Sequence, residues 1–472
     1  MEKWKYNFLF VVLALSGLSN LINAQPVVIE SPKNIIIMIG DGMGFNHLKS
    51  TEYYLYGIDS CVLIGKDFVR LAQATYPAIV ETKTDRVYNS GYNVEAVNKN
   101  PQSLNSGYTD SGAAATAMAT GKKTYKGAIG MGVENDTLFN LVEMAKMLGK
   151  SAGLVTSVPV SDATPAGFVA HSKSRGTNEE IFKQMIFNSR LDVLMGCGNP
   201  DYGKNGELQK MNAKYVGGDS LWKQLKNPIP QTFFNIDGSK FTVKDIDNDE
   251  KPDAWKVIQD SAAFASLTKS NPPKRILGIP EVYATLQQER SLKEGDTLPF
   301  ETPFTKGLPT LKLMTEGALN VLHTNQKGFF LMVEGGAIDW ASHSNQTGRM
   351  IEETTDFLHA IEKVVEWVNT NSSWHETMLI VTADHECGFL WAEEGNDKFN
   401  PIINEGKGKV PKMKWYSKNH TNSLVPFFVK GAGSNLFKLF ADEYDPNYGY
   451  FIQNTEIAQA VFLLWGSFEK MR

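Results

Sequence analysis

Imidazole and carboxylate side chains stand at the ends of several apolar runs of this sequence. Asp339 and His343 are four residues apart in AIDWASH, a spacing that puts two side chains on one face of a helical turn. Asp384 and His385 directly follow the run TMLIVTA, and His420 comes just before the run SLVPFF. A single histidine such as His420 would by itself indicate only a structural side chain. Carboxylate oxygen and imidazole nitrogen are ligands that zinc accepts without thiolates, so together these residues predict zinc binding.

A second group of polar side chains offers only oxygen. Asp41 follows the run NIIIMIG, Asp162 and Thr164 lie in SDATPA, and Glu334 lies in VEGG after another apolar run. Structural interpretations exist as well: Asp41 could be a turn residue between glycines, and Asp162 or Thr164 could cap a helix. Burying so many carboxylates at neighbouring strand ends would be strongly unfavourable without cations. Because magnesium prefers a few oxygen ligands and water, the group predicts a magnesium site.

The stretch YTDSGAAATAMATGKK contains one serine at the start of a helical pattern. Residues 113–120 favour a helix and Gly121 is a suitable C-cap, so the helix begins near Ser111. Ser111 or Asp110 could then simply be the N-cap. The position also suits a nucleophile, because the first turn of a helix offers free N–H groups to an anion. A serine hydroxyl needs a base or a metal for activation, so this second interpretation depends on the predicted metal ligands.

Basic residues follow this helix. Arg175, in HSKSRG, carries the planar fork that binds two phosphate oxygens at once, and it could equally be an exposed ion-pair partner. Lys122, Lys123 and Lys126 come directly after the helix, and we expect them in a solvated turn that makes no contact with substrate.

A cluster of acids from Asp245 to Asp253, DIDNDEKPD, resembles a calcium-binding loop. Its acids fall at loop positions one, three, five and nine. Glu250 occupies the position where such a loop usually has glycine, and Lys256 stands where the twelfth-position glutamate is expected. A calcium site and a solvated acidic turn both remain open.

Strand and helix patterns alternate along most of the chain. Continuous apolar runs at 34–40, 151–160, 329–333 and 377–382 are typical of buried parallel strands, and helical patterns at 137–150 and 354–370 lie between them. The predicted fold class is α/β, with a doubly wound, mostly parallel central sheet and helices on both faces. Ligands bind beyond the carboxyl ends of such strands, where the acidic residues fall. Residues 190–305, rich in Asn, Lys, Gly and Pro, are expected to form an insertion on this core rather than more sheet.

The N-terminus and the composition bear on location and partners. Residues 1–24 combine Lys3 and Lys5 with an apolar stretch and a small-residue cleavage site, which predicts a signal peptide and an exported protein, periplasmic or extracellular. An uncleaved membrane anchor is the alternative. No later run is long enough to span a membrane, and the net charge of −5 without a basic stripe argues against a nucleic-acid partner. Cys61, Cys197 and Cys387 cannot all pair with one another, and we interpret them as structural.

Taken together, these motifs resemble alkaline phosphatases, a family of secreted, metal-dependent phosphomonoesterases. The resemblance rests on IIIMIGDGMG, YTDSGAAATAMATGKKTYKGAIGM, DATPAGFVAHSKSR, DVLMGCG, FFLMVEGGAIDWASHSN, VTADHECG and HTNSLVPFFVKG, which occur in the order of the family. It implies one catalytic domain over residues 25–472, with the insertion at about 190–305 as a variable region. Trp340 and Gly112 stand at positions where relatives differ.

The resemblance also implies specific roles for the candidate residues. The first of two Zn²⁺ ions would be held by Asp339, His343 and His420. The second Zn²⁺ would be held by Asp41, Asp384 and His385. One Mg²⁺ would be held by Asp41, Asp162, Thr164 and Glu334. Ser111 would be the nucleophile, and Arg175 would clamp two phosphate oxygens.

The implied activity is hydrolysis of small phosphate monoesters through a covalent phosphoserine. Two other functions stay open: a phosphodiesterase of the same superfamily, and an exported phosphate-binding protein without catalysis. Relatives are commonly dimers, so a homodimer is possible.

Overall fold

The computed structural model describes residues 30–58, 65, 67–81, 86–227, 232–234, 238–247, 249–292, 297–393 and 400–466. The predicted signal peptide, residues 1–24, and Cys61 lie outside these ranges. Across the described ranges, no helix combines the length and the apolar character needed to cross a bilayer.

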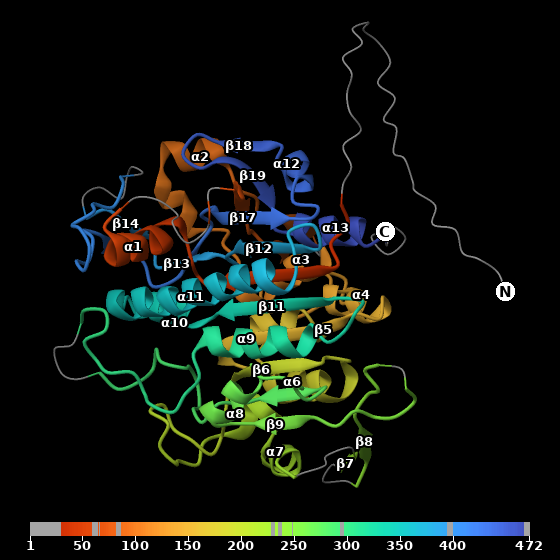
Figure 1. Cartoon of the computed structure of the whole chain (residues 1–472). Helices are drawn as coiled ribbons and strands as arrows, with labels where there is room; N and C mark the ends of the chain where they lie inside the picture. Colours follow the sequence, from red (N-terminus) through yellow and green to blue (C-terminus); the bar gives the residue numbers. More distant parts are fainter. Residues whose placement is uncertain are drawn as a thin grey trace, which may run out of the picture.

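An eleven-stranded sheet forms the centre of the fold (Figure 1). In spatial order its strands are β18 (Glu443–Asp445), β19 (Gly449–Gln453), β2 (Val69–Ala74), β17 (Val425–Gly431), β12 (Thr377–Thr382), β1 (Asn34–Gly40), β11 (Phe329–Gly335), β5 (Ser151–Pro159), β6 (Val193–Cys197), β10 (Ile276–Gly278) and β9 (Lys256–Ile258). Every neighbouring pair from β12 to β9 is parallel, whereas β17 runs antiparallel to both of its neighbours and β18 runs antiparallel to β19. The predicted mostly parallel sheet is therefore confirmed.

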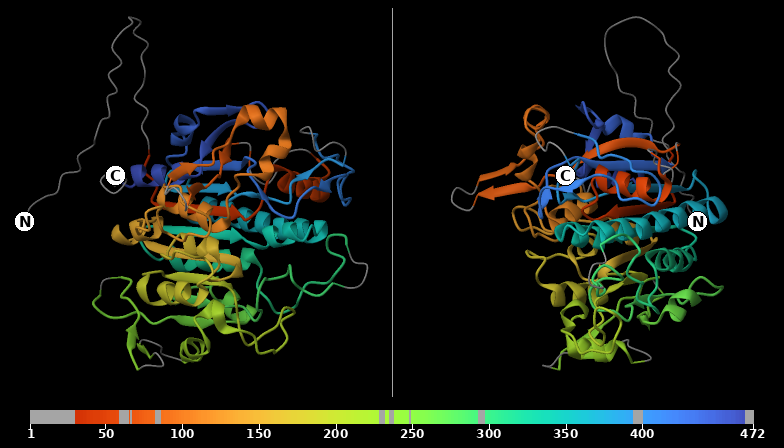
Figure 2. Two further views of the ribbon diagram at one scale, coloured as in Figure 1. Left: turned by 180° about the vertical axis from the view of Figure 1, so that it is seen from behind. Right: turned by 90° about the vertical axis from the view of Figure 1, so that its left-hand side faces the viewer.

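Helices cover both faces of this sheet, as the front and rear views show (Figures 1 and 2). Successive side chains of a strand point to opposite faces, so Ile35 and Ile37 of β1 enter one core cluster while Ile36 and Met38 enter the other. The first cluster is covered by α3 (Ser111–Thr120), α4 (Leu141–Met147), α5 (Ala163–Gly167), α6 (Asn178–Lys183), α7 (Asp219–Leu225), α12 (Leu436–Phe440) and α13 (Thr455–Leu464). The second is covered by α1 (Phe45–Tyr56), α8 (Ser261–Ser266), α9 (Leu311–Leu322), α10 (Ala337–His343) and α11 (Thr347–Asn371). Because both faces are covered, the central strands are apolar at nearly every position, which is why their runs do not alternate with polar residues.

Shorter elements surround the sheet. They are α2 (Val94–Lys99), the short helices Pro101–Asn105, Gln184–Asn188 and Ala213–Val216, and the strand pairs β3 (Ala78–Glu81) with β4 (Arg86–Asn89), β7 (Thr232–Phe234) with β8 (Lys240–Thr242), β13 (Glu386–Cys387) with β16 (His420–Thr421) and β14 (Leu390–Trp391) with β15 (Lys414–Trp415).

The prediction that residues 190–305 add no strands to the sheet is wrong. β6, β10 and β9 all lie within this stretch and pair in parallel beyond β5. β9 and β10 are only three residues long, so their apolar runs are too brief to stand out from the polar loops around them. The stretch therefore extends the core, and its interpretation as a family-variable insertion stays a prediction.

Candidate active site

Four neighbouring strands deliver acidic side chains to one edge of the sheet. Asp41 directly follows β1, Glu334 lies near the end of β11, Asp162 follows β5, and Asp384 comes two residues after β12. These strands are parallel, so their carboxyl ends meet at the same edge. Asp41, Glu334 and Asp384 are buried and Asp162 is half-buried. The sequence-based expectation that these acids gather at the strand ends agrees with this arrangement.

Ser111 faces one histidine of this group. Its Oγ lies 3.3 Å from His385 Nε2, and the same nitrogen lies 3.5 Å from Asp41 Oδ1 and 3.1 Å from Asp384 Oδ2. Asp384 Oδ1 accepts hydrogen bonds from the Gly42 and His385 N–H groups, which holds the other oxygen toward the imidazole. Two carboxylates, an imidazole and a hydroxyl thus converge on one small space.

The N-cap of α3 is Asp110 rather than Ser111. Asp110 Oδ1 accepts hydrogen bonds from the Ala113 N–H at 3.2 Å and the Gly127 N–H at 3.0 Å. Ser111 is the first residue of the helix, so its hydroxyl is not used for capping. Of the two structural interpretations of this stretch, Asp110 takes the capping role, and Ser111 is left available for chemistry.

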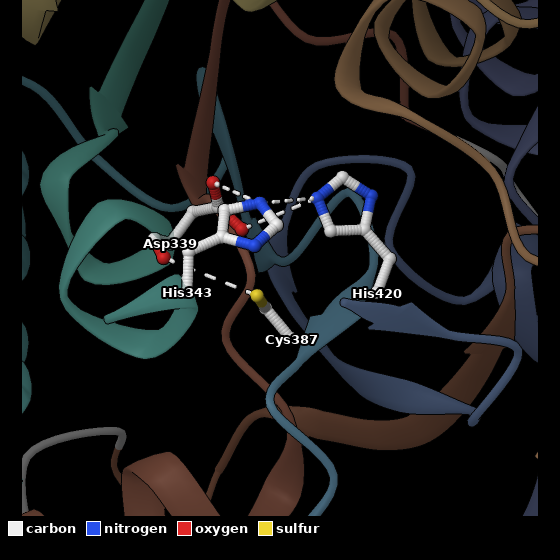
Figure 3. A group of neighbouring side chains, drawn as sticks. All are labelled: Asp339, His343, Cys387 and His420. Carbon is white, nitrogen blue, oxygen red and sulfur yellow. Dashed lines mark hydrogen bonds and ion pairs between the residues drawn. The ribbon is translucent and has the colours of Figure 1, made fainter. Parts of the chain in front are cut away.

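A second convergence joins Asp339, His343 and His420 (Figure 3). His343 Nε2 lies 3.0 Å from His420 Nε2, and the Asp339 carboxylate lies 3.3 Å from the first ring and 3.4 Å from the second. In each ring Nδ1 contacts a backbone carbonyl, that of Lys418 for His343 and that of Thr109 for His420. A carbonyl accepts only from a protonated nitrogen, so in the neutral rings both Nε2 atoms carry lone pairs toward each other. Either a proton on one ring or a metal cation between the two nitrogens relieves this repulsion.

Members of the oxygen-only group act on one another electrostatically: the charge of Asp162 acts on Glu334, and that of Glu334 acts on Asp41. Glu334 Oε2 accepts a hydrogen bond from Thr156 Oγ1, a residue that the sequence analysis did not single out. Asp162 Oδ1 accepts from the Ala163 N–H at 2.7 Å, so this residue caps α5 while it also borders the site. Thr164 is buried on the first turn of α5. The capping and the site interpretations of Asp162 are therefore compatible.

Arg175 is held by two of these carboxylates. One terminal nitrogen lies 3.1 Å from Asp110 Oδ2 and the other 3.2 Å from Asp162 Oδ1. About a third of the side chain is exposed, and the acids raise its pKa above the ordinary value even though burial alone would lower it. The ion pair with Asp110 thus holds the guanidinium group of Arg175 beside the helix that begins at Ser111. Both ion-pair partners of Arg175 belong to the candidate site.

Burial and neighbouring charges shift the pKa values of the acids in the site. Burial, reinforced by the charges of Asp384, Asp339 and Glu334, raises the pKa of Asp41 well above its usual range. Burial likewise raises the pKa of Glu334 to about 8 and that of Asp384 to about 6. Asp339 differs, because its histidine neighbours hold the pKa of this carboxyl below the usual range although burial opposes them. Without cations, some of these carboxyls must stay protonated to limit the repulsion between neighbouring carboxylates. Bound cations would remove that repulsion.

Unsatisfied buried atoms also fit bound cations. Among the buried oxygens of the described residues that have no hydrogen-bond partner, four belong to this site: Asp41 Oδ1, Thr164 Oγ1, Asp339 Oδ1 and Asp384 Oδ2. A buried oxygen without a partner costs about 1–3 kcal/mol, so four of them in one site call for a common explanation. Hard divalent ions take such oxygens as ligands, and the donors present match the nitrogen and oxygen ligands of zinc and the oxygen ligands of magnesium.

The acidic loop of residues 245–253 is a separate predicted feature. The carboxylates of Asp245, Asp247 and Asp253 lie within 4.8 Å of one another, but the Lys274 ammonium pairs with Asp247 and with Asp253. A lysine thus already supplies positive charge there, and calcium binding stays a prediction.

The expectation that all three lysines after α3 are solvated is wrong for Lys123. Its Nζ donates to Asn454 Oδ1 at 2.7 Å and lies 3.9 Å from the centre of the Tyr76 ring. Burial lowers its pKa to about 7. The contact joins segments 331 residues apart in sequence, which a local pattern cannot show.

Comparisons with known proteins agree with this site. A family model described as alkaline phosphatase matches residues 32–424. Alkaline phosphatase 4 of Bacillus subtilis is 28% identical over 79% of this chain and 66% of its own length, and alkaline phosphatase of Escherichia coli is 28% identical over 75% and 70%. Among solved structures, a cold-active alkaline phosphatase from the psychrophile Shewanella sp. is 25% identical with a TM-score of 0.60, covering 91% of this chain and 99% of that one. The enzyme from the Antarctic bacterium TAB5 has the same fold, with a TM-score of 0.58 at 22% identity, covering 93% and 99%. The matched region includes every residue of the two histidine groups and of the oxygen-only group. The chain therefore belongs to the alkaline phosphatase family, whose members are phosphoric monoester hydrolases.

Proposed function

We propose that this protein hydrolyses phosphate monoesters through a covalent phosphoserine at Ser111, in a site that binds two Zn²⁺ ions and one Mg²⁺ ion. The observation that carries the proposal is the position of Ser111 Oγ, 3.3 Å from His385 Nε2 at the first turn of α3. A protein that only bound phosphate would have no need of a hydroxyl there.

The ligand sets follow from the two convergences and the oxygen-only group. One zinc site comprises Asp339, His343 and His420. The other comprises Asp41, Asp384 and His385. The magnesium site comprises Asp41, Asp162, Thr164 and Glu334. When bound, the cations would supply Lewis-acid stabilisation of the attacking and leaving oxygens and lower the pKa of the Ser111 hydroxyl.

The protein's own residues would bind and orient the phosphoryl group. Ser111 Oγ attacks phosphorus in line with the ester oxygen, so an O–P bond forms to serine as the bond to the leaving alcohol breaks. Arg175 exchanges its contacts with Asp110 and Asp162 for two phosphoryl oxygens, and the N-terminal end of α3 adds a favourable dipole. Water then attacks phosphorus from the same side as the departed alcohol, which releases phosphate and restores the Ser111 hydroxyl.

The remaining parts of the proposal concern location and assembly. We infer export from the basic, apolar and small-residue segments of residues 1–24. A homodimer is consistent with the family, and size-exclusion chromatography with light scattering would measure it.

The experiment that tests this function compares Ser111→Ala with Ser151→Ala. Ser151 begins β5 at the opposite end of that strand from the site, so its variant controls for general effects of losing a hydroxyl. Both are assayed with an aryl phosphate monoester and with the matching diester. The proposal expects monoester turnover to fall by roughly 10³-fold or more in Ser111→Ala alone, since a nucleophile is lost. Dominant diester turnover by the wild type would support the phosphodiesterase instead, and no turnover of either ester would support a phosphate-binding protein.

A further inference from the structure

Cys387 lies beside the histidine pair of the first zinc site (Figure 3). It belongs to β13, which pairs with β16 so that Cys387 stands directly opposite His420. Side chains at opposite positions of two antiparallel strands lie on the same face of the ladder. The two-residue ladder therefore places a thiol and an imidazole side by side.

The thiol is buried within a complete set of metal-binding donors. The Sγ of Cys387, one ring nitrogen each of His343 and His420, and a carboxylate oxygen of Asp339 all lie within 4.8 Å of one another. Ligands around a tetrahedral zinc ion, at about 2.0–2.3 Å from the metal, lie roughly 3.3–3.8 Å apart. The imidazole and carboxylate donors already lie 3.0–3.4 Å apart, so the thiol is the donor that would have to approach, by about 1 Å, on binding an ion.

An independent feature also indicates a ligand at this point. Asp339 Oδ1 is buried and makes no hydrogen bond within the described residues, although His420 Nε2 is 3.4 Å away. The unpartnered oxygen, the two facing nitrogens and the thiol share one centre.

We propose that Cys387 is a fourth protein ligand of the metal ion held by Asp339, His343 and His420 before substrate binds. This inference rests on the proposed function, because it requires that metal site. On coordination the S–H bond breaks, its proton passes to solvent, and the sulfur electron pair forms the metal–sulfur bond, with no change of oxidation state.

The thiolate gives the site a specific chemistry. Sulfur and imidazole ligands select zinc, cobalt or cadmium over magnesium and calcium, so this position would reject the ion that the oxygen-only group favours. Substrate must also compete with the sulfur for the ion. The second zinc site has no such residue within the described part of the chain.

Cys197 provides a matched control. It is also a buried, unpaired cysteine, and its Sγ donates to the Ser157 carbonyl as that of Cys387 donates to the Asp339 carbonyl. Unlike Cys387, it belongs to none of the groups of potential metal ligands among the described residues. A spectroscopic signal that depends on Cys387 and not on Cys197 would locate the thiol at the metal.

The test replaces the native ions of the full-length enzyme with Co²⁺ alone and records absorption spectra. Wild type and Cys197→Ser are expected to show a thiolate-to-cobalt charge-transfer band in the near ultraviolet. The intensity of this band should stop rising once the site is saturated with cobalt. Cys387→Ser is expected to lose this band while elemental analysis still finds cobalt bound. A band that survives in Cys387→Ser, or that is absent from the wild type with cobalt bound, overturns the proposal.

A second measurement needs no variant at Cys387. X-ray absorption of the zinc-loaded wild type should reveal a sulfur scatterer at about 2.3 Å, in addition to nitrogen and oxygen. Purely nitrogen and oxygen scattering overturns the thiolate ligand but leaves the metal site intact. Failure of the wild type to bind zinc or cobalt at all would instead contradict the proposed function itself.

Discussion

Ser111 Oγ and His385 Nε2 lie 3.3 Å apart although 274 residues separate them in the chain. The contact joins the first turn of α3 to the segment that follows β12, and it brings a hydroxyl to the nitrogen that also faces Asp41 and Asp384. The imidazole that contacts this serine is itself a proposed metal ligand, so the reactivity of the serine depends on what the carboxylate and imidazole donors bind.

Substitution of Arg175 should weaken phosphate binding. Arg175→Ala removes two charge-assisted hydrogen bonds to phosphoryl oxygens, each worth about 1.5–3 kcal/mol, so kcat/KM for a monoester should fall roughly a hundredfold to ten-thousandfold. Arg175→Lys keeps the charge but not the fork and should recover only part of the loss. Steady-state kinetics with inorganic phosphate as competitor measure both effects. Unchanged KM and phosphate inhibition in Arg175→Ala would place the arginine outside the substrate site.

Two substitutions of Asp110 should affect the stability of the protein differently and its affinity for phosphate alike. Asn caps helices about as well as Asp, so Asp110→Asn should leave the free energy of unfolding nearly unchanged, whereas Asp110→Ala should cost about 1 kcal/mol. Both variants release Arg175 from one carboxylate and remove a negative charge beside the substrate, so both should bind phosphate more tightly. Denaturant unfolding and calorimetric phosphate titration test the two effects. Weaker phosphate binding in Asp110→Asn would show that Asp110 orients Arg175 and that its competition is unimportant.

Removal of one zinc ligand should remove one ion. His343→Ala leaves Asp339, His420 and the proposed ligand Cys387 at that centre. With one donor lost its zinc affinity should fall, so the dialysed protein should contain less zinc than the wild type, by as much as one ion per chain. His359→Ala, at an exposed position of α11, is the matched control and should keep the wild-type metal content. Elemental analysis after dialysis measures both. Equal zinc in the two variants would contradict the assignment of His343.

The metal-free protein should lose stability as the pH rises. The pKa values of Glu334, about 8, and Asp384, about 6, exceed those of unfolded acids, so the folded protein binds more protons than the unfolded chain. The contribution of these two groups to stability is therefore fully present below about pH 4 and is lost as the pH rises through 6 and then 8. Saturating zinc and magnesium hold these groups ionised and should abolish this dependence. Thermal unfolding of chelated and metal-loaded protein between pH 5 and 9 tests it, and parallel curves would show that the acids are not the ligands.

The meeting of the acids at the strand ends could be predicted from the sequence, because the carboxyl ends of parallel strands lie at the same edge of a sheet. Asp41 and Asp384 each follow a continuous apolar run, and β1 and β12 are neighbours, so sequence patterns alone indicate that these acids meet. The same logic failed for β9 and β10, whose runs of three residues carry too little signal.

Other parts of the site depend on long-range contacts that no local pattern contains. Asp110 and Arg175 pair although they are 65 residues apart in the chain, and Cys387 meets His420 through a ladder of only two residues per strand. Lys123 is half-buried and donates a hydrogen bond to Asn454, in a segment near the C-terminus. Such pairs depend on how loops close over the sheet, which becomes visible only once the chain is folded.

The most direct test of the account is to look for phosphate on Ser111. The wild-type enzyme is incubated with a labelled phosphate monoester at mildly acidic pH, quenched in acid and digested for peptide mapping, with Ser111→Ala treated in parallel. The account predicts label on the peptide that contains Ser111, formed before product accumulates and absent from the variant. Steady hydrolysis by the wild type with no label on this serine, or label that persists in Ser111→Ala, would contradict it.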